Sequence, residues 1–296
     1  MVATMTGFKT IGIFTSLLNR DTILVGRQIE EILAKKGCRV LFDKSFENSK
    51  FSNKFKTTSS EYLKKNSDLI IAIGGDGAML SCSRAYGSRG VPILGVNLGK
   101  LGFLTDIAPD ELTSRLLEVI DGNYIKDQRF FLKSTVKGSR RASLALNEVV
   151  IHSGAIAQMI EYDLYIDEVF VFRQKADGLI ICSPTGSTAY SLSAGGPIIH
   201  PNLDVISIIP MLPQSLTSSP LVVSAESRIK VILSNNANRV HLSFDSHNSI
   251  KLSGKNEINI CKSNSMLEFI HPSDHDFYDG CRNKLGWSSA IINLNN

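Results

Sequence analysis

The sequence predicts two domains, an N-terminal Rossmann-like parallel α/β domain and a C-terminal all-β domain of the β-sandwich type. Two observations predict this class. Strand and helix patterns alternate over roughly the first 123 residues, and short β-rich segments separated by turn residues follow them. A length of 296 residues fits two domains or one large one. We expect the α/β domain over residues 1–123, the all-β domain over 124–272, and a C-terminal segment, 273–296, that packs back on the first domain.

In the first domain, apolar runs predict strands and amphipathic patterns predict helices. The strand patterns cover residues 9–14, 39–42, 69–73 and 91–96. The helix patterns cover residues 22–36, 79–86 and 109–121, with Pro109 in the first turn of the last. The polar, lysine-dotted stretch 44–68 predicts a solvated loop with at most one helix, near residues 61–65. Because strands alternate with helices, we expect a parallel sheet.

In the second domain, short segments rich in β-forming residues follow one another, and several alternate apolar and polar side chains. Their spacing is short and turn residues lie between them, which is typical of a sandwich or a barrel. The predicted strands are residues 144–152, 161–172, 178–182, 205–210, 221–224, 228–234, 239–245 and 266–271.

Composition and charge exclude several classes of protein. A formal net charge of +4 is too small to indicate nucleic-acid binding, and we interpret Lys137, Arg140 and Arg141 as a solvated hairpin tip. There is no run of about 18 uncharged apolar residues and no signal-peptide pattern, so we expect a cytoplasmic protein without membrane contact. The five cysteines contain no Cys-x-x-Cys motif, which predicts reduced thiols, and the six histidines form no metal-type cluster in the sequence.

The motif Gly74-Gly75-Asp76-Gly77 lies between an apolar strand pattern and a helix pattern. Glycines at such a turn let the backbone approach an anion, and a helix start offers unpaired N–H groups to it. Asp76 is the one side chain of the turn that can accept a proton. Phosphate binding beside a single carboxylate indicates phosphoryl transfer to a hydroxyl group. The alternative is that Asp76 only caps the helix.

A second motif spans residues 183–198, which are rich in glycine, small side chains and hydroxyl groups and include one tyrosine. Small side chains leave room for a ligand, hydroxyls and backbone groups can fix it, and Tyr190 offers a flat face to a base. A purely structural Ser/Gly-rich turn is the alternative.

The chain resembles the bacterial NAD kinases at these motifs. The matching residues are Gly74-Gly75-Asp76-Gly77, the segment 97–104, Asn147-Glu148, Asp177-Gly178 and the segment 185–197, in the same order and spacing over nearly the whole chain. The Gly-Gly-Asp-Gly motif also occurs in 6-phosphofructokinases, diacylglycerol kinases and sphingosine kinases. The string Thr185 to Tyr190 together with Asn147-Glu148 is what indicates NAD.

The resemblance implies transfer of the γ-phosphoryl group of ATP, with Mg²⁺, to the 2′-hydroxyl of the adenosine ribose of NAD, giving NADP. It implies that Asp76 accepts the hydroxyl proton, that the divalent cation arrives with ATP without a cage of protein ligands, and that the protein is a homo-oligomer, typically a tetramer. The substrate-binding residues that it implies are Gly74, Gly75, Gly77, Asn147, Glu148, Gln158, Lys175, Asp177, Thr188, Ala189, Tyr190, Ser191, Leu192, Ser193 and His247.

Two positions depart from the family pattern, and two other functions stay open. Ser81 stands where many relatives have Arg or Lys, and Gln158 stands where relatives have His or Arg. The first alternative function is a lipid kinase of the diacylglycerol type from the same superfamily. The second is a non-catalytic NAD(P)-binding regulator, against which Asp76 argues, since a carboxylate beside phosphates weakens simple binding.

Overall fold

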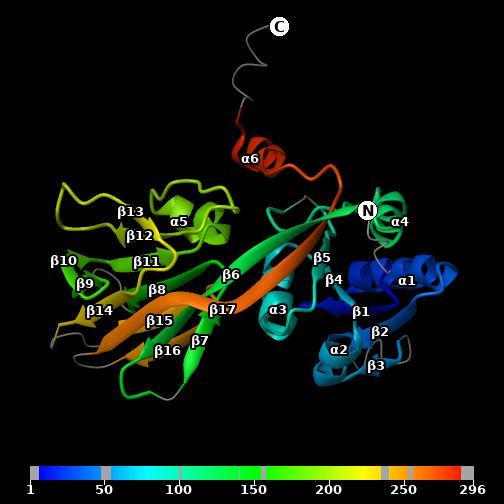
Figure 1. The fold of residues 1–296 in the computed structure, drawn as a ribbon, viewed down its shortest axis with the longest axis horizontal. Helices are drawn as coiled ribbons and strands as arrows, with labels where there is room; N and C mark the ends of the chain where they lie inside the picture. Colours follow the sequence, from blue (N-terminus) through cyan, green and yellow to red (C-terminus); the bar gives the residue numbers. More distant parts are fainter. Residues whose placement is uncertain are drawn as a thin grey trace, which may run out of the picture. The chain divides into compact units, whose positions relative to one another are not determined.

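A computed structural model describes residues 7–47, 55–99, 102–139, 141–154, 158–234, 240–252 and 256–287 (Figure 1). The chain divides into two compact units. Unit 1 consists of residues 1–128 and 267–296, and unit 2 consists of residues 129–266. The domain limits that we expected from the sequence, 1–123, 124–272 and 273–296, remain a prediction.

Unit 1 alternates strands and helices along the chain, as predicted. Its elements are β1 (Thr10–Thr15), α1 (Arg20–Lys35), β2 (Arg39–Asp43), η1 (Lys44–Phe46), β3 (Thr57–Thr58), α2 (Ser60–Asn66), β4 (Leu69–Ile73), α3 (Asp76–Tyr86), η2 (Gly87–Arg89), β5 (Ile93–Val96), α4 (Leu112–Ile120), the start of β6 (Tyr124–Val136), the end of β17 (Glu257–Pro272) and α6 (Phe277–Leu285). The strands pair in the order β17-β5-β4-β1-β2-β3, and every pair is parallel.

The chain order of these strands reverses between β1 and β4, because β2 and β3 extend the sheet on one side and β5 extends it on the other. Ligands of open parallel sheets bind outside the carboxyl ends of the strands at such a switch point. All five residues of β4 are buried, which is typical of a strand covered on both faces. Helices α1 and α4 share one apolar cluster with alternate residues of β1, β4 and β5. The Gly74–Gly77 motif leaves β4 at its carboxyl end, beside the switch point.

Unit 2 consists of two antiparallel sheets. Its remaining elements are β7 (Ala142–Ala145), β8 (Glu148–Ser153), β9 (Ile160–Ile166), β10 (Val169–Ala176), β11 (Gly178–Cys182), η3 (Thr185–Thr188), α5 (Tyr190–Ser193), β12 (Val205–Met211), β13 (Leu221–Ser224), β14 (Ile229–Leu233), β15 (Val240–Phe244) and β16 (Asn248–Leu252). One sheet has the order β10-β9-β14-β17, with β6 paired to β17 and β7 paired to β6, and the other has the order β13-β12-β11-β8-β15-β16.

The core of unit 2 lies between these two sheets. One continuous apolar cluster takes Val149, Leu179 and Leu242 from the second sheet and Leu164, Val231 and further residues from the first. Two antiparallel sheets that face each other across a shared core form a β-sandwich. The predicted fold class, a parallel α/β unit followed by an all-β sandwich, is therefore confirmed.

Several predicted element bounds are wrong, and local geometry explains them. The strand expected at 161–172 is the hairpin β9–β10, whose turn residues Asp167 and Glu168 both have positive φ although neither is glycine. The strand expected at 144–152 is divided into β7 and β8. The helix expected from Pro109 begins at Leu112. The sequence analysis also missed β3, β6, β16 and the first half of β17, in which polar residues interrupt the apolar pattern.

The segment expected as a strand of the all-β domain at 266–271 is the end of β17, which pairs in parallel with β5 in unit 1 through Phe269 and Ile270. All five cysteines are free. In the part of the chain that the structure describes, no helix is long and apolar enough to span a membrane.

Candidate functional site

The turn after β4 places Asp76 at the start of α3. Gly74 has φ +140°, a conformation that favours glycine, and its N–H donates to the carbonyl of Val96 at the end of the neighbouring strand β5 at 2.9 Å. A Cβ at Gly74 would also lie 2.7 Å from the Cβ of Ala78. Gly75 is the N-cap residue of α3, so Asp76 occupies the first position of the helix and does not cap it. The helix-cap interpretation of Asp76 is therefore wrong.

The carboxylate of Asp76 is held by the segment that follows β5. The backbone N–H groups of Phe103 and Leu104 donate to Asp76 Oδ2 and Oδ1, each at 3.0 Å. A Cβ at Gly102 would lie 1.8 Å from Asp76 Oδ1. Position 102 therefore has to be glycine for the carboxylate to occupy this place.

Asn97 and Thr105 fix the two ends of this segment. The side chain of Asn97 accepts hydrogen bonds from the N–H groups of Leu98 and Gly99 at 2.7 and 2.8 Å, and its amide nitrogen donates to Thr105 Oγ1 at 2.7 Å. Thr105 Oγ1 also accepts from the N–H of Gly102 at 2.9 Å. Both Asn97 and Thr105 are buried, so the return of the chain towards α3 is part of the packed structure.

The surface above the start of α3 is open. Gly75 and Gly77 are exposed, and no atom beyond their chain neighbours lies within 4 Å of an added Cβ at either position. The first N–H groups of an α-helix have no partner within the helix and carry the positive end of its dipole. This arrangement can receive a phosphate group beside the single carboxylate of Asp76.

In unit 2, Asp245 organises the backbone around Asn147 and Glu148. Its carboxylate accepts hydrogen bonds from three consecutive N–H groups, those of Leu146, Asn147 and Glu148, at 3.0, 2.8 and 3.3 Å. Asp245 is buried and has φ +48°, and Ser246 follows with φ +54°. A non-glycine pair in this conformation is strained, and such strain is common at functional sites.

The side chains of Asn147 and Glu148 are buried with unused polar atoms. Among the described residues, Asn147 Oδ1 and Glu148 Oε2 have no hydrogen-bond partner. Burial, and after it the charge of Asp245, raises the pKa of Glu148 to about 8. Glu148 is therefore mostly neutral at pH 7. Buried polar atoms without a partner are costly, which indicates that a ligand completes their bonding.

The segment 183–199 packs directly against Asn147. The N–H of Ser183 donates to the Asn147 carbonyl at 2.9 Å, and a Cβ at Gly186 would lie 2.4 Å from the same oxygen. Ser187 Oγ donates to the Pro184 carbonyl and accepts from the Ile199 N–H, which closes the segment on itself. The structure thus joins two motifs that lie some 40 residues apart in the sequence.

The hydroxyl-rich segment also carries the aromatic ring that we predicted to face a base. Tyr190 begins α5 and is 41% exposed. Ser191 is buried, Thr188, Ala189 and Leu192 are half-buried, and Ser193 is exposed. Arg129, which the sequence analysis missed, donates from Nη1 to Thr185 Oγ1 at 3.0 Å and is itself buried.

The other predicted binding residues of unit 2 lie at the ends of strands. Asp177 is half-buried between β10 and β11, and its N–H donates to the Met211 carbonyl. Lys175, Gln158 and His247 are exposed, and among the described residues no hydrogen bond or ion pair joins their side chains to Asn147 or Glu148. Their assignment to the site remains a prediction.

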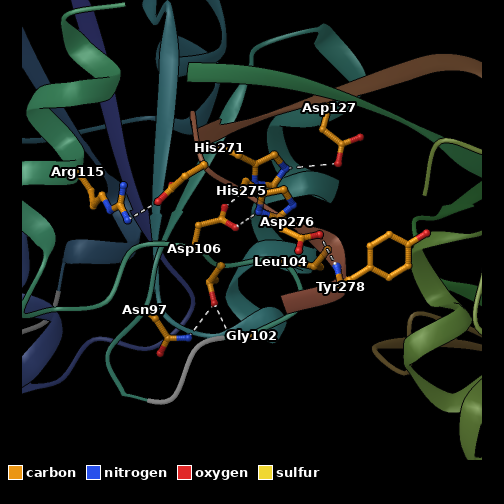
Figure 2. Close-up of polar contacts among 12 residues, drawn as sticks. Asn97, Gly102, Leu104, Asp106, Arg115, Asp127, His271, His275, Asp276 and Tyr278 are labelled. Atoms are coloured by element: carbon orange, nitrogen blue, oxygen red, sulfur yellow. Dashed lines mark hydrogen bonds and ion pairs between the residues drawn. The ribbon is translucent and has the colours of Figure 1, made fainter. Parts of the chain in front are cut away.

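A cluster of charged residues in unit 1 lies next to the Asp76-holding segment, and the sequence analysis missed it (Figure 2). Asp106 follows Thr105, and its two carboxylate oxygens contact Nδ1 of His271 at 2.5 Å and Nδ1 of His275 at 2.6 Å. On its other side, His271 Nε2 lies 3.4 Å from Asp127 Oδ2. The His-x-x-x-His spacing was a visible signal, but Asp106 is distant in the sequence and only the fold brings it there.

The donor atoms of Asp106, His271 and His275 lie within 4.8 Å of one another, which is close enough for a metal ion. The two imidazole rings, however, are stacked with centroids 3.9 Å apart and an interplanar angle of 17°. Nearly parallel rings aim their Nδ1 atoms side by side at the Asp106 carboxylate rather than at one common point. We therefore interpret the cluster as a set of charged hydrogen bonds.

Comparisons with known proteins agree with this arrangement. Residues 11–124 match the profile of the ATP-NAD kinase N-terminal domain, and residues 146–272 match that of the ATP-NAD kinase C-terminal domain. The NAD kinase of Saccharophagus degradans is 43% identical, over 96% of this chain and 98% of the relative. The NAD kinase of Teredinibacter turnerae is also 43% identical, over 98% of this chain and 100% of the relative.

Two solved structures have the same fold. Yeast NADH kinase complexed with NADH has a TM-score of 0.85 at 25% identity, covering 96% of this chain and 89% of that one. An NAD kinase from Archaeoglobus fulgidus in complex with ATP has a TM-score of 0.72 at 29% identity, covering 94% and 97%. The resemblance predicted from the motifs is thereby confirmed, and the chain belongs to the ATP-NAD kinase family.

Proposed function

We propose that this protein is an NAD kinase, which transfers the γ-phosphoryl group of ATP to the 2′-hydroxyl of the adenosine ribose of NAD. The observation that carries the proposal is the fixed carboxylate of Asp76 beside the open, glycine-lined start of α3. The solved structures of one relative in complex with ATP and of another in complex with NADH support ATP as the donor and a nicotinamide dinucleotide as the acceptor.

In this proposal Asp76 orients the acceptor hydroxyl and receives its proton. Hydrogen bonds from the backbone N–H groups of Phe103 and Leu104 keep this carboxylate in one orientation. In a loose transition state for phosphoryl transfer the proton leaves late, so orientation matters more than basicity. Gly74, Gly75 and Gly77 line the place where backbone N–H groups bind phosphate.

In unit 2, the buried atoms Asn147 Oδ1 and Glu148 Oε2 supply the polar contacts for the dinucleotide. Glu148 is neutral at pH 7, so it can donate a hydrogen bond as well as accept one and adds no charge next to the diphosphate. Tyr190 stacks on a base of the dinucleotide. The predicted roles of Gln158, Lys175, Asp177, Ser193 and His247 belong to the same dinucleotide-binding proposal.

The residues at the Asp76 turn fit a magnesium ion that arrives with ATP. In the described part of the Gly74–Gly77 turn and of the segment 97–106, Asp76 is the carboxylate that can face a ligand there, and each of its oxygens keeps an unused lone pair. A site with one carboxylate suits Mg²⁺ that retains waters and phosphate ligands. When bound, the ion supplies neutralisation of the charge on the transferred phosphoryl group.

The test is NADP formation by the purified protein with NAD, ATP and Mg²⁺, measured with an NADP-specific dehydrogenase. NADP should form, and Asp76→Asn should reduce turnover severely while NAD still binds. Diacylglycerol as the acceptor tests the lipid-kinase alternative. NAD binding without transfer to either acceptor would favour the regulator. A homotetramer and a cytoplasmic location remain predictions.

A further inference from the structure

The segment that holds Asp76 is itself held by a charged cluster around the buried side chain of His271. Phe103 and Leu104 donate to Asp76. Asp106, two residues further along, contacts His271 and His275 (Figure 2). Because only one residue separates Leu104 from Asp106, a shift of Asp106 also moves the backbone N–H groups of Phe103 and Leu104. The position of the Asp76 carboxylate therefore depends on what fixes Asp106.

We propose that His271 is a positioning residue for Asp76: by bridging Asp106 and Asp127 it fixes the segment 102–106, whose amides orient the Asp76 carboxylate. The inference rests on the proposed function, because it assigns His271 to the same phosphoryl transfer. In this proposal His271 does not contact a substrate, because its side chain is buried and both ring nitrogens face carboxylates.

The rest of the segment is anchored by neutral hydrogen bonds. The N–H of Asn97 donates to the Ile107 carbonyl at 2.8 Å, and Thr105 bonds Asn97 and Gly102. Charged hydrogen bonds are roughly twice as strong as neutral ones. His271 is buried, and the side chains of Asp106 and His275 are 12% and 19% exposed, so solvent screens this cluster less than it screens a fully exposed ion pair.

Three titratable side chains face His271, each from a different element. Asp106 lies on the return segment after β5, Asp127 lies on β6, and His275 stacks on the ring from the turn before α6. Burial opposes a charge on His271, but the two carboxylates outweigh it and raise the pKa of His271 to about 9. The same contacts hold the pKa of Asp106 well below its usual range despite its burial.

A doubly protonated imidazole hydrogen-bonds Asp106 through Nδ1 and forms an ion pair with Asp127, whose Oδ2 lies 3.4 Å from Nε2, whereas a neutral imidazole loses the ion pair. This difference fixes the direction of the pH dependence. The bridge is complete at pH values well below 9 and is lost as the pH rises through about 9. Turnover at saturating ATP and NAD should fall over the same range if the bridge positions Asp76.

The first experiment compares the pH dependence of kcat in wild type, His271→Gln and a matched control. His271→Gln should lower kcat at pH 7 about tenfold or more and should lack the decline near pH 9, so that the two curves converge at high pH. His241→Gln is the control, because His241 also stacks on a histidine, His152, but its ring faces no carboxylate among the described contacts. Its curve should match wild type.

The second experiment asks whether His271 acts through Asp76. In an Asp76→Asn background, His271→Gln should cause little additional loss of kcat, because this background lacks the carboxylate that His271 orients. Equal fractional losses in both backgrounds would show that His271 acts by general stability and would overturn the proposal.

The third experiment needs no activity, so it separates this inference from the proposed function. Amide hydrogen exchange of residues 102–106 should be faster in His271→Gln than in wild type, with His241→Gln unchanged. If His271→Gln does not fold, wild type measured at pH 7 and pH 10, with rates corrected for intrinsic exchange, gives the same comparison. Unchanged protection of 102–106 in either test would overturn the proposal, as would stoichiometric zinc in the purified protein that His271→Gln removes.

Discussion

A Cβ atom at Gly102 would lie 1.8 Å from Oδ1 of Asp76, well inside van der Waals contact. The same Cβ would lie 2.8 Å from Thr105 Oγ1, so it cannot move away from Asp76 towards Thr105. The observed position of the Asp76 carboxylate therefore requires that residue 102 has no side chain.

Gly102→Ala should therefore displace the Asp76 carboxylate and reduce kcat. A displacement of about 1 Å costs roughly 100-fold in rate when the group must be oriented. Steady-state kinetics at saturating NAD and ATP measures this loss. Gly280→Ala is the matched control, because its Cβ would make an ordinary contact of 3.6 Å with the Phe103 ring. Full activity of Gly102→Ala would contradict the proposed geometry.

Asp245→Ala should weaken NAD binding and lower stability together. The substitution leaves the buried N–H groups of Leu146, Asn147 and Glu148 without their acceptor, and each unpaired group costs about 1–3 kcal/mol. Asp245→Asn keeps one oxygen acceptor and should be milder in both respects. Urea unfolding and the KM for NAD measure the two effects. Equal behaviour of the Ala and Asn variants would argue against the hydrogen bonds as the cause.

Tyr190→Ala should raise the KM for NAD with little change in kcat, because it removes a stacking surface and no reacting group. Stacking of a base on an aromatic ring contributes about 1–3 kcal/mol, or roughly 5- to 150-fold in affinity. Tyr190→Phe retains the flat face and should stay near wild type. An unchanged KM in the Ala variant would remove Tyr190 from the binding site.

Glu148→Gln should change how stability depends on pH. The pKa of Glu148 is raised to about 8 in the folded protein, so its contribution is fully present below its ordinary pKa and is lost as the pH rises to about 8. Relative to the Gln variant, wild type should lose about 1.4 kcal/mol per pH unit over this range and then level off. Urea unfolding of both proteins from pH 5 to 9 tests this, and parallel curves would contradict a buried, neutral Glu148.

The sequence was sufficient for the parts of the fold that depend on local pattern. The all-apolar run of β4 and the glycines after it predicted a buried strand that leads through a glycine turn into a helix, and the structure has both. The division of the β9–β10 hairpin was not predictable in this way. Its turn residues, Asp167 and Glu168, both adopt positive φ. Aspartate tolerates this conformation, but Glu168 does not favour it and no glycine or asparagine marks the turn in the sequence.

The candidate site shows the same limit. Asp76, Asn147 and Glu148 lie within short motifs and could be proposed from the sequence. Asp245 contacts the backbone of Asn147 from 98 residues away, and His271 contacts Asp106 from 165 residues away. Neither residue stands in a sequence pattern that indicates its partner. Their roles follow from strand pairing and burial, which a single sequence does not reveal.

Strand β17 has a consequence for how the protein is made. Its residues up to Met266 belong to unit 2, whereas Leu267 to Pro272 belong to unit 1 and pair with β5. A ribosome must therefore synthesise all of unit 2 before unit 1 receives its last parallel strand and His271. Folding during translation usually completes the N-terminal domain first. Here the nascent chain completes unit 1 only near the end of synthesis, so prematurely terminated chains should not contain a complete unit 1.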